Sequence, residues 1–182
     1  NIPHGPFIPK PEDREVIAKR LTDPQFDHLN KGLKNRLASY LGMIRNIDTN
    51  MGDLMEFLDH QGLSKNTILI FKTDNGSLLG PQYFNAGMRG KKTELWEGGH
   101  RVPCFIRWPE GNLVKPQDID GLTQVQDLLP TLLDLCKIKP NAGPEFDGIN
   151  LAPVLRGQEQ VSDERVLIMN YSRMPGFANY PS

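Results

Sequence analysis

The sequence predicts a layered α/β fold, in which a mainly parallel or mixed sheet is flanked by helices. Apolar residues recur every three or four positions through residues 29–60, which is the period of one long amphipathic helix. Residues 67–73 form a nearly continuous apolar and β-branched run, typical of a strand buried on both faces of a mostly parallel sheet. A helix followed directly by such a strand is a building unit of layered α/β folds.

The other predicted elements are shorter or less regular. Residues 1–13 contain four prolines, so we expect an extended loop there and neither a helix nor an inner strand. Gly62 is expected to end the long helix. The remaining elements are strands at 102–107 and 166–171 and a second amphipathic helix at 124–138.

Composition and charge exclude several classes of protein. The 182 residues are 38% hydrophobic and 24% charged, as expected for a soluble domain with a real core. A net charge of -1 lacks the excess of positive charge that is typical of proteins that bind nucleic acid or anionic lipid. No apolar run reaches the roughly 20 residues that span a bilayer, and no signal peptide is visible. Cys104 and Cys136 do not have the spacing of a zinc site. The sequence favours two buried free thiols, and a disulfide between them is the alternative.

Asp74, Asn75 and Gly76 come directly after the predicted strand at 67–73. Ligands of open α/β sheets bind at the carboxyl ends of strands, and the Asp and Asn oxygens suit Ca²⁺ or Mg²⁺. The same tripeptide is also an ordinary turn sequence. Local sequence alone therefore leaves a metal site and a simple turn as alternatives.

A basic, glycine-rich loop follows about fifteen residues later, with Arg89, Lys91 and Lys92. Such a loop can hold a sulfate or phosphate, and it can equally be a solvated surface loop. His4 lies between prolines in the first loop; a lone histidine is usually structural, but in an active site it can protonate a leaving alkoxide. Asp48, beside the apolar stripe of the long helix, is interpreted as a capping or packing residue more readily than as a ligand.

The order and spacing of these segments resemble those of sequence motifs in one known protein family. The matching patterns are N-x-P-H-x-P, Y-x-x-x-I-x-x-x-D-x-x-x-G, T-S-D-N-G with Lys-Thr in place of Thr-Ser, and R-G-G-K-x-x-x-[WY]-E-G-G-x-R-x-P, followed by D-L-x-P-T and D-G. They fall at Asn1–Phe7, Tyr40–Gly52, Lys72–Gly76, Arg89–Lys92 with Trp96–Pro103, Asp127–Thr131 and Asp147–Gly148. Over residues 1–157 the chain resembles the C-terminal half of the type I sulfatases, within the alkaline-phosphatase-like superfamily.

The resemblance implies a fold, an activity and roles for single residues. The fold would be the alkaline-phosphatase-like layered α/β fold, and the activity sulfuric ester hydrolysis. Asp74 and Asn75 would be ligands of Ca²⁺, with Mg²⁺ possible, and Lys92 would bind the sulfate. His4 would contact the sulfate and help to protonate the leaving group. Residues that would shape the loop are Arg89, Lys91 and Glu97.

One departure from the family pattern limits this expectation. The family's nucleophile is a formylglycine made from the Cys or Ser of C/S-x-P-x-R, and the chain contains no such motif. The paired aspartates and the Lys-x-His segment that complete the family's site are also absent. We therefore expect a fragment, inactive alone, whose nucleophile and N-terminal half lie outside the chain. Residues 1–160 would belong to the catalytic domain and 161–182 would begin a C-terminal subdomain.

The resemblance also suggests partners and a location, and it leaves alternatives. The expected substrate is a sulfated small molecule or carbohydrate, with no nucleic acid partner and no membrane span, in a protein that acts outside the cytoplasm. A related phosphatase, phosphodiesterase or phosphotransferase would share the metal chemistry. A truncated domain without activity is the third interpretation.

Overall fold

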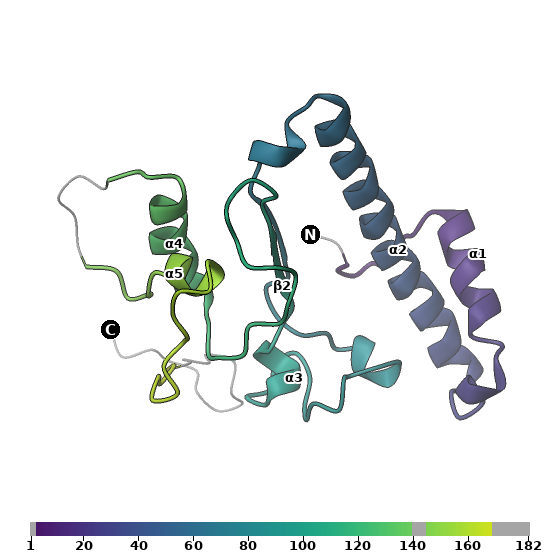
Figure 1. The fold of residues 1–182 in the computed structure, drawn as a ribbon. Helices are drawn as coiled ribbons and strands as arrows, with labels where there is room; N and C mark the ends of the chain where they lie inside the picture. The colour runs from purple at the N-terminus through teal and green to yellow at the C-terminus, as the bar shows by residue number, and fades with distance from the viewer. Residues whose placement is uncertain (1–2, 140–144, 169–182) are drawn as a thin grey trace, which may run out of the picture. The chain divides into compact units, whose positions relative to one another are not determined.

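The computed structural model describes residues 3–139 and 145–168, and its secondary structure is shown in Figure 1. The chain divides into two compact units. The first unit comprises residues 1–64 and 70–105, and the second comprises residues 65–69 and 106–182. Asn1 of the first sequence motif lies outside the described residues.

The first unit is built on α2, which spans Lys31–His60 and confirms the predicted long helix. The side chain of Asn30 accepts a hydrogen bond from the Leu33 amide at 2.9 Å and so caps the first turn. At the other end Gly62 adopts φ +68°, and its amide donates to the Asp59 carbonyl at 3.0 Å. The helix therefore ends where the sequence predicted, at a residue that tolerates the left-handed conformation.

The helix α1, Pro11–Arg20, was not predicted, because the prolines suggested an extended loop through residue 13. That expectation was wrong for the last three residues, since proline is well tolerated in the first turn of a helix. α1 packs on α2 (Figure 1). The guanidinium of Arg45 in α2 donates a hydrogen bond to the carboxylate of Asp13 at 3.0 Å. The buried carboxylate of α1 therefore has a counter-charge on α2.

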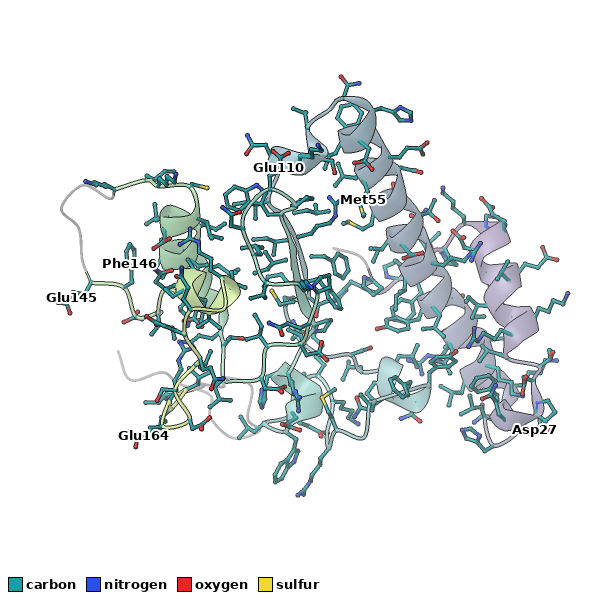
Figure 2. All side chains as sticks on the ribbon, in the orientation of Figure 1. Asp27, Met55, Glu110, Glu145, Phe146 and Glu164 are labelled. Carbon is teal, nitrogen blue, oxygen red and sulfur yellow. The ribbon has the colours of Figure 1, made fainter. Side chains whose placement is uncertain are left out.

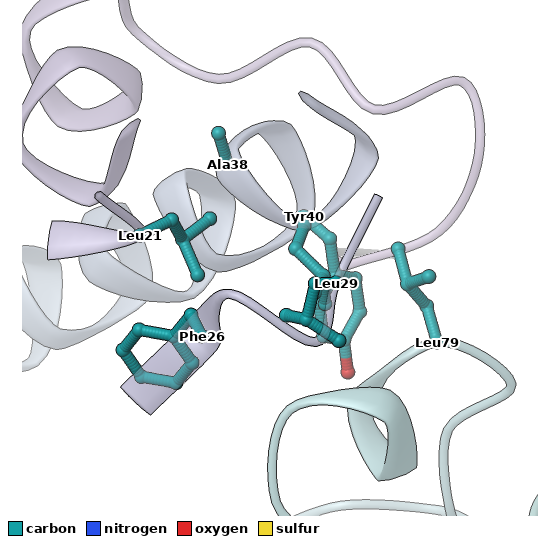
Figure 3. Packing of buried hydrophobic residues seen from close by; sticks show 7 residues of the cluster. Leu21, Phe26, Leu29, Ala38, Tyr40 and Leu79 are labelled. Carbon is teal, nitrogen blue, oxygen red and sulfur yellow. The ribbon is translucent and has the colours of Figure 1, made fainter. Parts of the chain in front are cut away.

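The core of the first unit lies where α1, the first half of α2 and the following loops meet (Figure 3). Phe26, in the short 3-10 helix η1 (Pro24–Phe26), stacks on Tyr83 with ring centroids 5.3 Å apart. In the second half of α2, apolar side chains including Met55 are exposed (Figure 2). The buried core residues are Leu21, Phe26, Leu29, Leu37, Ala38, Tyr40 and Leu79.

The strands β1, Leu69–Lys72, and β2, Cys104–Arg107, form a two-stranded antiparallel sheet. The prediction of a mainly parallel sheet with helices around it is not met in the described residues. The amide of Gly76, just after β1, donates to the carbonyl of Gly99, just before β2, at 2.9 Å. This contact brings the end of one strand to the start of the other, so β2 runs back along β1. β1 is also half-buried at three of its positions, and not buried on both faces.

The second unit contains the predicted second helix, divided into η4 (Val125–Asp127) and α4 (Leu128–Leu135). The hydroxyl of Thr131 accepts from the Leu151 amide at 2.8 Å, just before the short helix α5 (Ala152–Leu155). An added Cβ at Gly148 would collide with the Gln126 carbonyl. These contacts give the D-L-x-P-T and D-G segments a structural role.

The apolar core of the second unit is small. Leu135, Ala152 and Leu155 form its buried centre, and the side chain of Trp108 packs against them. Of the predicted strand at 166–171, residues 166–168 have no regular structure and residues 169–171 lie outside the described residues.

Two further expectations concerned the state of the cysteines and the presence of a membrane-spanning segment. Cys104 and Cys136 are both free, as favoured, but both are exposed, so the prediction of buried thiols was wrong. Within the described ranges, no helix has the length and apolar character needed to cross a membrane. The remaining short helices are η2 (Ser64–Asn66), η3 (Gly80–Gln82) and α3 (Glu97–His100).

Candidate functional site

Three segments of the first unit meet through their backbones at the end of β1. They are residues 74–77, residues 89–92 and α3. Besides the bond from Gly76 to Gly99, the amide of Gly98 donates to the Arg89 carbonyl at 2.8 Å. The amide of Lys92 donates to the Ser77 carbonyl at 3.3 Å. Residues far apart in sequence are thus joined by main-chain hydrogen bonds.

The glycines of these segments are required by the closeness of the backbones. An added Cβ at Gly76 would collide with the carbonyl oxygen of Gly98, and one at Gly98 would collide with that of Gly90. An added Cβ at Gly99 would collide with the Glu94 carbonyl. The D-N-G, R-G and E-G-G sequences therefore pack directly against one another, which gives their spacing a physical reason.

Asp74 and Asn75 lie directly after β1, as the sequence predicted. The exposed carboxylate of Asp74 accepts the backbone amide of Asn75 at 3.0 Å. The Asn75 side chain is half-buried and has no hydrogen-bond partner among the described residues. Both offer hard oxygen atoms, the ligand type that Ca²⁺ and Mg²⁺ take. The donors fit such an ion in kind, although Ca²⁺ takes about six to eight oxygens.

The described ranges hold no group of three or more His, Cys, Asp and Glu side chains that could form a metal site.

The two lysines of the basic loop differ in their surroundings. Lys91 is exposed, and its ammonium lies 3.8 Å from the Glu94 carboxylate. Lys92 is half-buried, and its ammonium has no ion-pair partner within the described part of the chain. Of the two, Lys92 is the cation available to an anion, and its backbone bond to Ser77 places it beside the Asp74 segment.

The other charged residues of the loop have local partners. The guanidinium carbon of Arg89 lies 3.4 Å from the centroid of the Trp96 ring, a cation–π contact. Arg101 lies 3.3 Å from the Glu97 carboxylate. The ring of His100 lies 3.1 Å from the Leu95 carbonyl. These contacts link neighbouring residues of the loop to one another.

His4 is not brought into contact with the other predicted site residues in the described structure. Its exposed ring lies 3.1 Å from the carbonyl of the neighbouring Gly5. The loop that carries it is fixed nearby, because the rings of Phe7 and Tyr40 meet edge to face at 5.4 Å. Asp48 is exposed in the middle of α2, so it neither caps the helix nor packs in the core.

The sulfatase family model matches residues 3–138, which is most of the chain. The chain belongs to the sulfatase family. Mouse steryl-sulfatase is 33% identical over 137 residues, which cover 71% of this chain and 22% of that protein. The chain thus spans roughly a fifth to a third of the length of the relatives it matches.

Solved structures support the same fold. The structure of Ps i-CgsB in complex with k-i-k-neocarrahexaose matches with a TM-score of 0.71 and 29% identity, over 88% of this chain and 33% of that one. The phosphonate monoester hydrolase SpPMH from Silicibacter pomeroyi matches with a TM-score of 0.59 and 25% identity, over 87% and 32%. The chain therefore has the fold of part of an alkaline-phosphatase-like sulfatase, as the resemblance implied.

Sequence reasoning missed two polar residues of this region. The hydroxyl of Ser77 accepts the amides of Leu79 and Gly80, at 3.1 and 2.9 Å, and so shapes the start of the loop. Asn85 holds the backbone of the basic loop. A serine that caps a turn is a recognisable local signal, whereas the sequence shows Asn85 only as a turn residue.

Proposed function

We propose that this sulfatase chain forms the anion-holding side of an active site that hydrolyses sulfate esters. The observation that carries the proposal is the contrast between the two lysines. Lys92 is half-buried, has no ion-pair partner in the described structure and is tied to Ser77, whereas Lys91 is exposed and near Glu94. A compact ammonium in a half-buried position binds an oxyanion more strongly than one in open solvent.

Asp74 and Asn75 are proposed as ligands of a divalent cation, Ca²⁺ or Mg²⁺, completed by groups from outside this chain. When bound, the cation would neutralise negative charge on the sulfate oxygens. The role of the chain is to present these two oxygen donors beside Lys92. The glycine contacts support this arrangement, because they fix the three segments without using any of the proposed ligand side chains.

His4 is proposed to contact the sulfate and to protonate the leaving alkoxide, a role that histidine side chains often take in general acid catalysis. The nucleophile, a formylglycine, is proposed to lie outside this chain, which has no C/S-x-P-x-R motif. The chain by itself is then inactive. We also propose a division at residue 160 between a catalytic part and the start of a C-terminal subdomain, and a place of action outside the cytoplasm.

The proposed substrate class is a sulfated carbohydrate or small molecule. One structural relative, Ps i-CgsB, was solved in complex with k-i-k-neocarrahexaose, and one sequence relative is a steryl-sulfatase. Both relatives support a sulfate carried on an organic alcohol, and neither selects between a sugar and a sterol for this chain.

The test compares Lys92→Ala with Lys91→Ala in the 182-residue chain. Amide NMR shifts are followed while sodium sulfate replaces sodium chloride at constant ionic strength. We expect Lys92→Ala to weaken sulfate binding by about tenfold or more, since charge-assisted hydrogen bonds are the strong ones, and Lys91→Ala to change it much less. Equal effects of the two substitutions, or no response of the wild-type chain to sulfate, would overturn the proposal.

Hydrolysis of phosphonate or phosphate esters is the second candidate function. The structural match to a phosphonate monoester hydrolase favours it. An intact enzyme that contains this chain, assayed with an aryl sulfate and with an aryl phosphonate monoester, would separate the two candidates. Faster turnover of the phosphonate by the intact enzyme would replace the sulfatase proposal with this one.

A further inference from the structure

Asn85 holds the turn that precedes Lys92. Its half-buried side-chain amide donates to the carbonyl of Met88 at 2.6 Å and to the carbonyl of Gly90 at 2.9 Å. The amide of Met88 donates back to the Asn85 carbonyl at 2.9 Å. One side chain therefore fixes two consecutive bends of the basic loop.

The backbone of this loop is in an unfavourable conformation that needs such support. Ala86 has φ +50° and Thr93 has φ +76°, the left-handed region that residues with a Cβ rarely adopt. Thr93 is β-branched and directly follows Lys92. Strained residues persist only where surrounding contacts determine the backbone, and they concentrate at functional sites.

On the side away from Asn85, the turn packs against Trp96. Gly90 has φ +82°, and an added Cβ there would lie 2.6 Å from the Cβ of Trp96. The ring of Trp96 in turn holds the guanidinium of Arg89. The turn at Gly90 is thus held between the Asn85 amide and Trp96, two residues before Lys92.

We propose that Asn85 is a positioning residue for Lys92. Its two hydrogen bonds hold the turn in the conformation that presents the Lys92 ammonium to an oxyanion. This inference rests on the proposed function, because it takes Lys92 to be the residue that binds the anion. Asn85 itself touches neither the anion nor the reacting atoms.

The experiment uses the 182-residue chain with inorganic sulfate as the probe, and the NMR signal of the Lys92 side chain as the readout. Asn85→Ala removes both donors, and Asn85→Asp removes them without changing size. Gln82→Glu is the control, since it makes the same amide-to-carboxylate change on an exposed side chain of the nearby short helix η3. It distinguishes the effect of the added negative charge on sulfate binding from the effect of the lost hydrogen bonds.

We expect Asn85→Ala to bind sulfate about fivefold more weakly than the wild type. We expect Asn85→Asp to bind it about fivefold more weakly than Gln82→Glu, which carries the same added charge. In both variants the Lys92 signal should respond less to sulfate at saturation, which loss of overall stability alone would not produce. In the wild type, the Asn85 side-chain amide protons should exchange with solvent more slowly than those of Gln82.

The outcomes separate this inference from the proposed function. If Lys92→Ala abolishes sulfate binding while the Asn85 variants bind as their references do, the positioning role is wrong and the proposed function stands. If the wild-type chain does not respond to sulfate, both are wrong. Should the variants not fold, the wild-type exchange measurement decides, and exchange of the Asn85 amide as fast as that of Gln82 would overturn the positioning role.

Discussion

The guanidinium of Arg165 binds both carboxylate oxygens of Asp127, with N–O distances of 2.9 and 2.6 Å. The carboxylate of Asp127 is fully buried, and it also accepts the backbone amides of Gln124 and Ile149, at 2.8 and 2.9 Å. This pair joins residues 38 positions apart in the sequence. It is the central polar contact of the second unit.

Removing Arg165 should therefore destabilise the second unit. Arg165→Ala leaves a buried carboxylate without its counter-charge, which costs about 3 kcal/mol or more in the free energy of unfolding. The pair of Arg156 and Asp134, 2.9 Å apart and only half-buried, is the control, and Arg156→Ala should cost much less. The urea midpoint followed by circular dichroism measures both. Equal midpoints for the two variants would show that burial of the pair does not matter.

Acid should weaken the same contact. Burial raises the pKa of Asp127, but the hydrogen bonds from Arg165, Gln124 and Ile149 outweigh it and leave the pKa below its ordinary value. A carboxyl whose pKa is lowered on folding stabilises the fold above its unfolded-state pKa, about 3.9, and loses that contribution as the pH falls through the folded-state value.

The expected result is a difference in stability between wild type and Asp127→Asn that is large at pH 7 and narrows below about pH 4. Unfolding curves of both proteins across this range measure it. Hydrogen bonds from Asn150 and Arg156 also lower the pKa of Asp134, so only the difference between the two proteins isolates Asp127. A difference that stays constant with pH would contradict the prediction.

Gly98→Ala should disturb the candidate site. The added methyl would collide with the Gly90 carbonyl, and overpacking of this kind costs about 1–3 kcal/mol. Hydrogen exchange of the Lys92 amide should then become faster, because its bond to Ser77 depends on the same backbone contacts.

The control for this substitution is Gly52→Ala, in the middle of α2, where an added Cβ meets nothing within 4 Å. That change should stabilise the chain by up to about 1 kcal/mol, since alanine favours helices over glycine. Unchanged exchange of the Lys92 amide in Gly98→Ala would argue against a close-packed glycine site.

Calcium should bind the isolated chain weakly or not at all. Asp74 and Asn75 supply two donors, whereas Ca²⁺ takes about six to eight oxygens. Calorimetry with CaCl₂ on wild type and on Asp74→Ala measures the affinity directly. Sub-micromolar binding that Asp74→Ala abolishes would show that this chain holds a complete site.

Regular patterns in the sequence predicted the elements whose signal is local. The period of α2 and its end at Gly62 were correct because one apolar stripe and one glycine suffice to specify them. α1 was missed because residues 11–20 lack an apolar stripe. Its acidic first turn and basic last turn, with Lys19 and Arg20, were the available signal.

Contacts between distant residues could not be predicted in this way. The apolar run at 67–73 indicates a strand but carries no information on the direction of its neighbour. The bond between Gly76 and Gly99, which turns the chain back, depends on the whole loop between them. The family pattern groups Asp74, Asn75 and Lys92 in one site, and the structure joins their two segments by the backbone bond from Lys92 to Ser77. No local pattern pairs Asp127 with Arg165.

Close packing of Gly76, Gly98 and Gly99 separates the shape of the loop from its chemistry. The segments contact one another through main-chain atoms, and the side chains of Asn75 and Lys92 take no part in these contacts, while that of Asp74 accepts only the amide of its neighbour Asn75. Exchange of those side chains for others of similar size would leave the scaffold intact. The same backbone can therefore display a different set of polar groups, and an inactive copy can keep the shape of an active one.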